Sequence, residues 1–204
     1  GQLAQHGDAF VGDGFGVSHR RHASVYDIAL LLPRAAGYLV LREVEVLDKL
    51  SVEPARPYTV VLGGSKVSDK LDVIDALLHC ADRLIIGGGM AYTFFKAMGG
   101  SIGTSLVEED KLELAKELIQ KAKAKNCNLL LPEDSILGDK FDKDANTQIA
   151  DNMSIPDGWM GLDIGPKAVE LFSKTILHSK TILWNGPMGV FEMEKFSTGT
   201  KKVA

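Results

Sequence analysis

Two glycines and two lysines follow a strongly apolar run of the chain, and this stretch constrains the fold most. Residues 58–62 (YTVVL) have the composition of a buried parallel strand, and the stretch 63–70 (GGSKVSDK) comes directly after them. Residues 71–78 are apolar at helical spacing. Glycines at a strand end, backbone N–H groups at a helix start and mobile positive charge predict a phosphate-binding turn. The spacing differs from that of a P-loop.

Two more strands lead into glycine-rich turns. Residues 84–86 run into Gly87, Gly88 and Gly89, and residues 181–184 run into 185–189 (NGPMG). Ligands of open α/β sheets bind at the carboxyl ends of the strands. Three glycine-rich strand exits therefore predict one ligand edge lined by backbone.

Strands and helices alternate from residue 58 onward. Strands are expected at 58–62, 83–86, 128–131 and 181–184, with helices at about 68–80, 90–98 and 166–176 between them. Ser105 and Glu108 have the spacing of a capping box for a helix that carries Leu112, Ala115, Ile119 and Ala122 on one face. Residues 141–155 read as a polar surface excursion with edge strands. The predicted fold class is α/β, a mostly parallel Rossmann-like sheet with helices on both faces.

Composition excludes several classes of protein. A formal net charge of −4 argues against nucleic acid as a partner, although local positive charge can still bind phosphate. The chain has no run of about 18 apolar residues, so no membrane span is expected. It also lacks a signal-peptide pattern at its start. Cys80 and Cys127 are far apart in sequence, which favours reduced thiols and a cytoplasmic location.

Four sequence words, in order, closely resemble the phosphoglycerate kinase family. They are the turns at 63–70, 87–91 and 185–189 and the stretch 155–166 (IPDGWMGLDIGP), while residues 10–20 (FVGDGFGVSHR) look like the end of that family's first domain. The resemblance spans essentially all 204 residues and implies part of a two-domain kinase. Residues 1–33 would be a remnant of the N-terminal phosphoglycerate-binding domain, 34–51 the interdomain helix, and 52–204 the nucleotide-binding domain without its C-terminal end. Because the family's closing Gly-Gly-Asp-Ser/Thr word is missing, the chain is expected to be incomplete.

The resemblance implies reversible phosphoryl transfer between 1,3-bisphosphoglycerate and MgADP, giving 3-phosphoglycerate and MgATP in glycolysis, by a monomer. Lys66 would contact the transferring phosphoryl group and Lys70 the inner phosphates, beside Gly63 and Gly64. The adenine slot would be formed by Gly87, Gly88, Gly89, Leu106, Gly161, Leu162 and Val190, and the ribose site by Asn185, Pro187 and Glu192. His19 and Arg20 would belong to the phosphoglycerate site. Ser65, Gly12 and Gly14 depart from the residues common in the family, which weakens any role for Gly12 itself.

Other interpretations remain open at this point. Lysines are usually solvated surface groups, and a triple glycine can be a tight turn with no ligand. A Rossmann-type oxidoreductase fits glycine-rich strand exits, but the chain lacks G-x-G-x-x-G after its first α/β strand. A nucleotide-binding module without catalytic activity is the second alternative, and the 204-residue chain alone is expected to be inactive. His19 and His22 lack the further ligands that a protein-held metal needs, so Mg²⁺ is expected only with the nucleotide.

Overall fold

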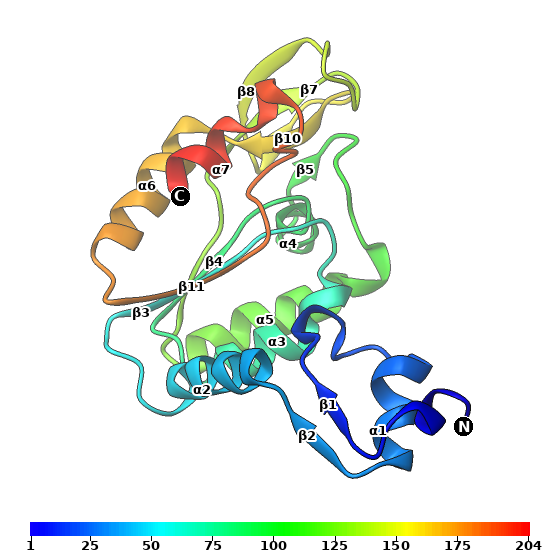
Figure 1. Ribbon diagram of the computed structural model, residues 1–204. Coiled ribbons are helices and arrows are strands. Elements are labelled where there is room, and N and C mark those ends of the chain that lie inside the picture. The colour runs from blue at the N-terminus through cyan, green and yellow to red at the C-terminus, as the bar shows by residue number, and fades with distance from the viewer. The chain divides into compact units, whose positions relative to one another are not determined.

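The chain forms two compact units, Gly1–Pro54 and Ala55–Ala204, in a computed structural model (Figure 1). The structure describes all 204 residues except the side chains of Ser51, Leu71 and Asp72. No helix in the described part of the chain is long and apolar enough to cross a membrane.

The first unit contains one parallel strand pair and one long helix. Its elements in chain order are η1 (Leu3–His6), β1 (Phe10–Gly12), η2 (Phe15–Val17), η3 (Ala23–Asp27), α1 (Ile28–Leu31), β2 (Arg34–Ala36) and α2 (Tyr38–Val52). The sequence predicted a helix over 34–50, and its start is wrong because residues 34–36 pair with β1 as a strand. Gly37 is the N-cap in an extended conformation, and the Asp13 carboxylate accepts from the N–H of Val40 at 3.0 Å. That distant cap fixes the true helix start.

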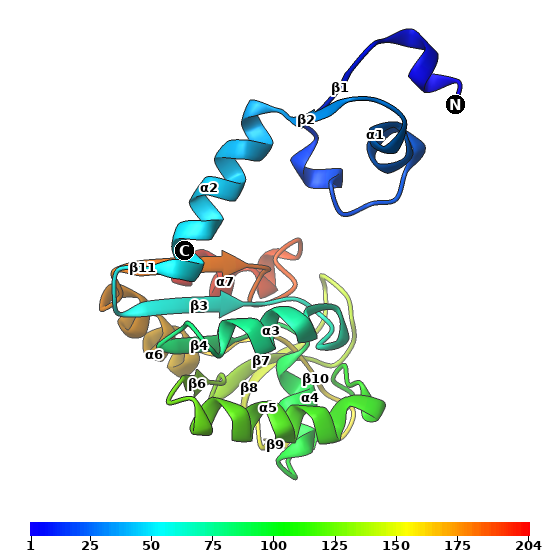
Figure 2. The same ribbon diagram turned by 90° about the horizontal axis from the view of Figure 1, so that it is seen from below.

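The central sheet of the second unit has four strands, all parallel, in the order β11-β3-β4-β6. These are β3 (Tyr58–Leu62), β4 (Arg83–Ile86), β6 (Asn128–Leu130) and β11 (Thr181–Asn185). From β3, the chain adds β4 and then β6 on one side. The last strand, β11, lies on the other side of β3, and Figure 2 shows these two strands side by side. This arrangement is a topological switch point, where open α/β sheets bind ligands.

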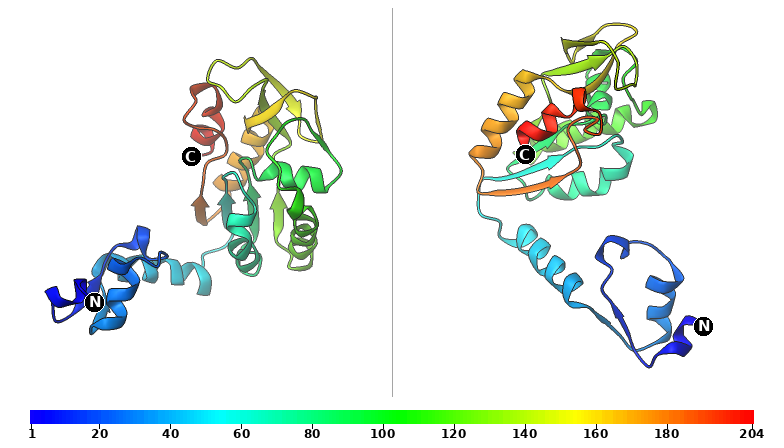
Figure 3. Two further views of the ribbon diagram at one scale, coloured as in Figure 1. Left: turned by 90° about the vertical axis from the view of Figure 1, so that its right-hand side faces the viewer. Right: turned by 45° about the horizontal axis from the view of Figure 1, so that its top comes forward.

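Helices cover both sides of this sheet, as expected. Figures 1 and 3 show α3 (Leu71–Leu77) and α5 (Leu112–Ala124) on one side, with α6 (Pro166–Leu177) and α7 (Thr198–Val203) on the other. Val61 and Ile85 point to the α6 side, where they pack against the fully buried Phe172. Because strand residues alternate between faces, Val60 and Leu84 supply the opposite side. Burial on both faces explains why the sequence of β3 is apolar apart from Thr59, whose hydroxyl forms a hydrogen bond with the Ser179 hydroxyl.

A second, antiparallel sheet of order β10-β7-β8 was not expected in this form. It contains β7 (Asp134–Gly138), β8 (Thr147–Asp151) and β10 (Met160–Ile164). Edge strands were predicted only within 141–155, where β8 lies. The remaining elements of the unit are η4 (Ser68–Lys70), α4 (Ala91–Ala97), β5 (Ser101–Ile102), η5 (Glu109–Lys111), β9 (Ser154–Ile155) and η6 (Glu194–Phe196).

Candidate functional site

The three glycine-rich turns meet at the carboxyl end of the parallel sheet. The register pairs Asn185 with Leu62 and Leu62 with Ile86, so the three strands end side by side. The turns then bond to one another across the sheet. The N–H groups of Gly63 and Gly64 donate to the carbonyls of Asn185 and Pro187, and those of Gly87 and Gly88 donate to Leu62 and Met188, at 2.8–3.1 Å.

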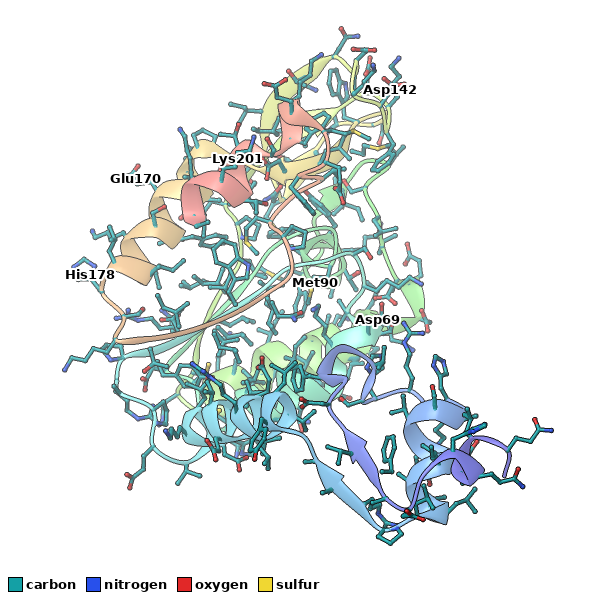
Figure 4. The ribbon with its side chains drawn as sticks, in the orientation of Figure 1. Asp69, Met90, Asp142, Glu170, His178 and Lys201 are labelled. Carbon is teal, nitrogen blue, oxygen red and sulfur yellow. The ribbon has the colours of Figure 1, made fainter. Side chains whose placement is uncertain are left out.

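This interlocking corrects one expectation. The turn at 63–70 was expected to offer backbone N–H groups to a phosphate, but those of Gly63 and Gly64 donate within the protein, as do those of Gly87 and Gly88. The glycines instead allow close approach of backbone to backbone: a β-carbon at Gly88, whose φ is +67°, would lie 2.5 Å from the carbonyl oxygen of Gly64. A side chain at Gly88 would therefore strain the turns rather than fill a ligand slot. Met90, fully buried, continues the turn into α4 by donating its N–H to Gly64 (Figure 4).

A cavity of about 480 Å³ opens beside these turns. Nine residues that the resemblance assigned to nucleotide binding line it: Gly64, Gly88, Gly89, Leu106, Gly161, Leu162, Pro187, Val190 and Glu192. Five others that were assigned do not line it: Gly63, Lys66, Lys70, Gly87 and Asn185. Gly63 and Gly87 support the wall from behind through the bonds between the turns. The cavity has the size and largely apolar lining of a small-molecule site.

Sequence reasoning missed several lining residues, among them Tyr92, Thr104, Phe141, Met160 and Met188. Tyr92 is buried, and its hydroxyl forms a 2.7 Å hydrogen bond with the Ser135 hydroxyl. A β-carbon at Gly161 would overlap that hydroxyl, so Gly161 is required for packing as well as for cavity shape. Burial raises the pKa of Tyr92, which keeps it neutral. Phe141 is 63% exposed and comes from the loop before β8, where a polar stretch gave no signal for a cavity wall.

The loop that carries the lysines begins where the cavity lining ends, at Gly64 and Ser65. Lys66 lies in this loop before η4 and is exposed to solvent, whereas Lys70 ends η4, so the two lysines do not lie on one helix. The Lys70 ammonium donates to the side-chain oxygen of Asn185 at the end of β11. Val67 between them is fully buried and anchors the loop in the core.

Glu108 holds the same loop, and this overturns the predicted capping box. Its carboxylate accepts from the N–H groups of Val67 at 2.6 Å and Ser68 at 3.1 Å, and from the Ser68 hydroxyl at 2.5 Å. Ser105, the other member of the predicted box, accepts from the N–H of Gly161 at 2.9 Å. Helix α5 begins later, at Leu112, after the 3₁₀ turn η5. The serine and the glutamate thus make tertiary contacts instead of a local cap.

The first unit carries the other predicted pair. His19 and Arg20 are exposed, and neither lines the hollow of about 450 Å³ that β1 and its neighbours form in this unit. Within the residues that the structure describes, no cluster of three or more His, Cys, Asp or Glu side chains could hold a metal ion. Cys80 and Cys127 are free thiols, and Cys127 is buried.

The glycine-lined cavity lies at the switch point of a parallel sheet, with lysines on the adjoining loop, and this is the place where proteins of the open α/β class bind ligands. Comparison with known proteins narrows this class. A sequence model of phosphoglycerate kinase matches residues 1–204, and the chain belongs to the phosphoglycerate kinase family.

Relatives in this family cover the whole chain. It is 54% identical over 204 residues to a phosphoglycerate kinase of Synechococcus sp. (strain WH7803), and 52% identical to "Phosphoglycerate kinase 3, cytosolic" of Arabidopsis thaliana. The solved structure of phosphoglycerate kinase from Coxiella burnetii superposes with a TM-score of 0.87 at 40% identity, covering 99% of this chain and 52% of that one. The chain spans about half the length of the curated relatives it matches, 51% of each of these two.

Proposed function

We propose that this chain is the nucleotide-binding part of a phosphoglycerate kinase. The reaction is reversible transfer of a phosphoryl group from the carboxyl phosphate of 1,3-bisphosphoglycerate to the terminal phosphate oxygen of ADP, giving 3-phosphoglycerate and ATP. The single observation that carries the proposal is the cavity of about 480 Å³ whose wall ends at Gly64 and Ser65, next to the lysine loop. The protein acts as a cytoplasmic monomer, and the free thiols of Cys80 and Cys127 fit that location.

The cavity fits a purine base with its ribose. Gly89, Leu106 and Leu162 supply apolar surface against which a flat base packs, while Glu192 offers a carboxylate that accepts hydrogen bonds from ribose hydroxyls. The Ser65 end of the cavity then directs the phosphates towards Lys66 and Lys70. Among the described residues, the N–H groups of Ser65 and Lys66 have no internal acceptor, so they are available to a phosphate oxygen.

The two lysines have different tasks. Asn185 holds the Lys70 ammonium in one place, which suits a fixed phosphate of the bound nucleotide. Lys66 has no side-chain partner among the described residues and can follow the phosphoryl group as it moves. Stabilising developing charge without a general base is sufficient, because the acceptor oxygen is already ionised.

The described residues do not form a cage for Mg²⁺, so the ion would enter bound to the nucleotide phosphates. It supplies charge neutralisation there. The chain's own contribution to phosphate charge comes from Lys66, Lys70 and backbone N–H groups. His19 and Arg20 are the residues of the phosphoglycerate site that the family resemblance assigns within this chain. We therefore expect nucleotide binding without measurable turnover from the 204-residue polypeptide.

Binding measurements test this proposal. ADP and ATP should bind competitively with a fluorescent adenine nucleotide, and NADH should not compete if the oxidoreductase alternative is wrong. Lys70→Ala should weaken ADP binding by about 1.5–3 kcal/mol, the value of one charge-assisted hydrogen bond. Lys96→Ala removes the charge of an exposed lysine on α4 and should leave binding unchanged. Failure of both ADP and ATP to bind would contradict the proposal.

Turnover distinguishes a kinase from a nucleotide-binding module. In a phosphoglycerate kinase assay of an active whole-length protein that contains this chain, Lys66→Ala should lower the rate far more than the affinity for ADP. The reason is that its target is the moving phosphoryl group rather than the bound nucleotide. A normal rate in this variant would favour the module.

A further inference from the structure

The carboxylate of Glu108 occupies an unexpected position for an acidic group. It lies against Val67 and Ser68, between the two lysines of the proposed phosphate site. Burial opposes its ionisation, but the hydrogen bonds from the Ser68 hydroxyl and the two N–H groups outweigh burial and lower the pKa of Glu108. The group is therefore charged at neutral pH. A negative charge at this position repels a phosphate, so attraction between the Glu108 carboxylate and the ligand does not explain why the carboxylate lies there.

The backbone around Glu108 is fixed independently of the lysine loop. Its own N–H donates to the hydroxyl of Thr93, a buried residue of α4, at 3.2 Å. Thr104 and Leu106, just before it, line the cavity, and Ser105 accepts from the N–H of Gly161, another lining residue. Residues 104–108, which we name the bridging segment, thus connect the cavity lining to the lysine loop.

We propose that Glu108 is a positioning residue that sets the lysine loop against the cavity, so that recognition of the nucleotide's phosphates depends on it while recognition of the base does not. This inference rests on the proposed function. The carboxylate acts through Val67 and Ser68 and does not touch the ligand.

The hydrogen-bond geometry explains the dependence. Three donors from two consecutive residues converge on one carboxylate, which leaves the loop a single arrangement before any ligand arrives. Preorganised donors bind an anion without a further ordering cost. If the carboxylate is removed, the N–H groups of Val67 and Ser68 lose their acceptor, and the loop must reorganise to satisfy them.

Charge and positioning predict opposite results for Glu108→Gln. If Glu108 acted only through its charge, removing a negative group beside two lysines would strengthen ADP binding relative to adenosine. If it positions the loop, the neutral amide oxygen holds the N–H groups of Val67 and Ser68 more weakly than the carboxylate does, and the Ser68 hydroxyl can no longer donate to the amide's N–H₂ group, so the preference for ADP falls. We expect the ratio of ADP to adenosine affinity to drop about tenfold, equivalent to about 1.4 kcal/mol, with adenosine affinity unchanged.

The experiment measures ADP and adenosine binding to the chain, wild type and variant, by competition with a fluorescent adenine nucleotide. Glu109→Gln is the matched control. Glu109 is exposed, and this substitution removes the same charge one residue away from Glu108. It should leave the ratio unchanged or raise it. Ser68→Ala removes one of the three donors and should lower the ratio about threefold, a loss of about 0.65 kcal/mol; it carries the test if Glu108→Gln does not fold.

Each outcome supports or overturns the positioning role of Glu108. An unchanged or raised ratio in Glu108→Gln overturns the positioning role, and so does an equal loss of ADP and adenosine binding, which would mean general damage to the cavity. A wild type that binds neither ligand overturns the proposed function and this inference with it. A lowered ratio with adenosine binding intact supports both.

Discussion

Helices α2 and α6 begin in the same way in two different units of the chain. Each has an extended glycine as N-cap, Gly37 or Gly165, and each takes its capping carboxylate from a distant aspartate, Asp13 or Asp134. A β-carbon on either glycine would lie 2.5 Å from the carboxylate oxygen, so glycine is what lets the aspartate approach. The same device is therefore built twice from unrelated stretches of sequence.

The two caps differ in burial. Asp134 is 3% exposed and accepts from the N–H groups of Lys167 and Ala168 at 3.2 and 2.9 Å, whereas Asp13 is exposed and accepts from Val40 alone. Water can replace an exposed cap but not a buried one, since a buried N–H without a partner keeps its full desolvation cost. The comparison teaches that one hydrogen-bonding pattern can have very different energetic weight in two settings.

Removing the buried cap should have the largest effect. Asp134→Ala leaves the buried N–H of Ala168 and the part-buried N–H of Lys167 unpaired and should lower the free energy of unfolding by about 2–4 kcal/mol. Urea denaturation followed by circular dichroism measures this. Asp157→Ala, an exposed aspartate with no capping role in the described structure, should change stability by less than about 0.5 kcal/mol. If both variants lost the same free energy of unfolding, burial of the Asp134 cap would not explain its effect on stability.

A third aspartate extends the comparison to pH. Asp163 is buried, and burial raises its pKa to about 6, against hydrogen bonds from the N–H groups of Gly199 at the start of α7 and of Ile164. A folded-state pKa above the unfolded value of about 3.9 means that the folded protein binds the proton more tightly. Its contribution to stability is therefore present below about pH 4 and is lost as pH rises to about 6.

The variant Asp163→Asn should abolish this dependence. Between pH 4 and pH 6 the wild type should lose about 1–3 kcal/mol relative to the variant, measured as the difference between their unfolding free energies at each pH. Other titrating groups are common to both proteins and cancel in that difference. A constant difference across this range would show that Asp163 does not titrate there.

The exposed cap should give the smallest effect. Asp13→Ala removes one hydrogen bond at the start of α2 and should cost about 0.5–1 kcal/mol, the lower range for a helix cap. Hydrogen exchange of the Val40 amide is the sharper measurement, because it reports on this end of the helix alone. A loss as large as that of Asp134→Ala would break the comparison.

The sequence predicted the parallel sheet well because each strand is a short, mostly apolar run of residues. Residues 58–62 are apolar apart from Thr59, which is the composition expected of a strand buried on both faces. The start of α2 and the capping box failed for one shared reason. Local spacing predicted that Ser105 and Glu108 cap a helix, but both groups found partners far away in sequence, at Gly161 and at Val67–Ser68. Tertiary hydrogen bonds of this kind have no local signature.

Within the candidate site, too, residues in recognisable sequence words were predicted, while residues joined by long-range contacts were not. Gly64, Gly88, Gly89 and Gly161 were identified because long sequence words carry them, and they do line the cavity. The hydroxyl pair of Tyr92 and Ser135 was not, because the two residues lie 43 positions apart on α4 and β7. Roles for His19, Arg20 and the lysines stay predictions, to be tested by binding.

The bonds between the three glycine turns also constrain how this protein can evolve. Each turn satisfies the backbone of its neighbour, so an inserted or deleted residue in one turn would displace donors from the acceptors of the other two. Length in these turns is thus as restricted as residue type. We expect lineages of this family to vary freely in loops such as 139–146, while residues 63–64, 87–88 and 185–188 keep their count even where their side chains change.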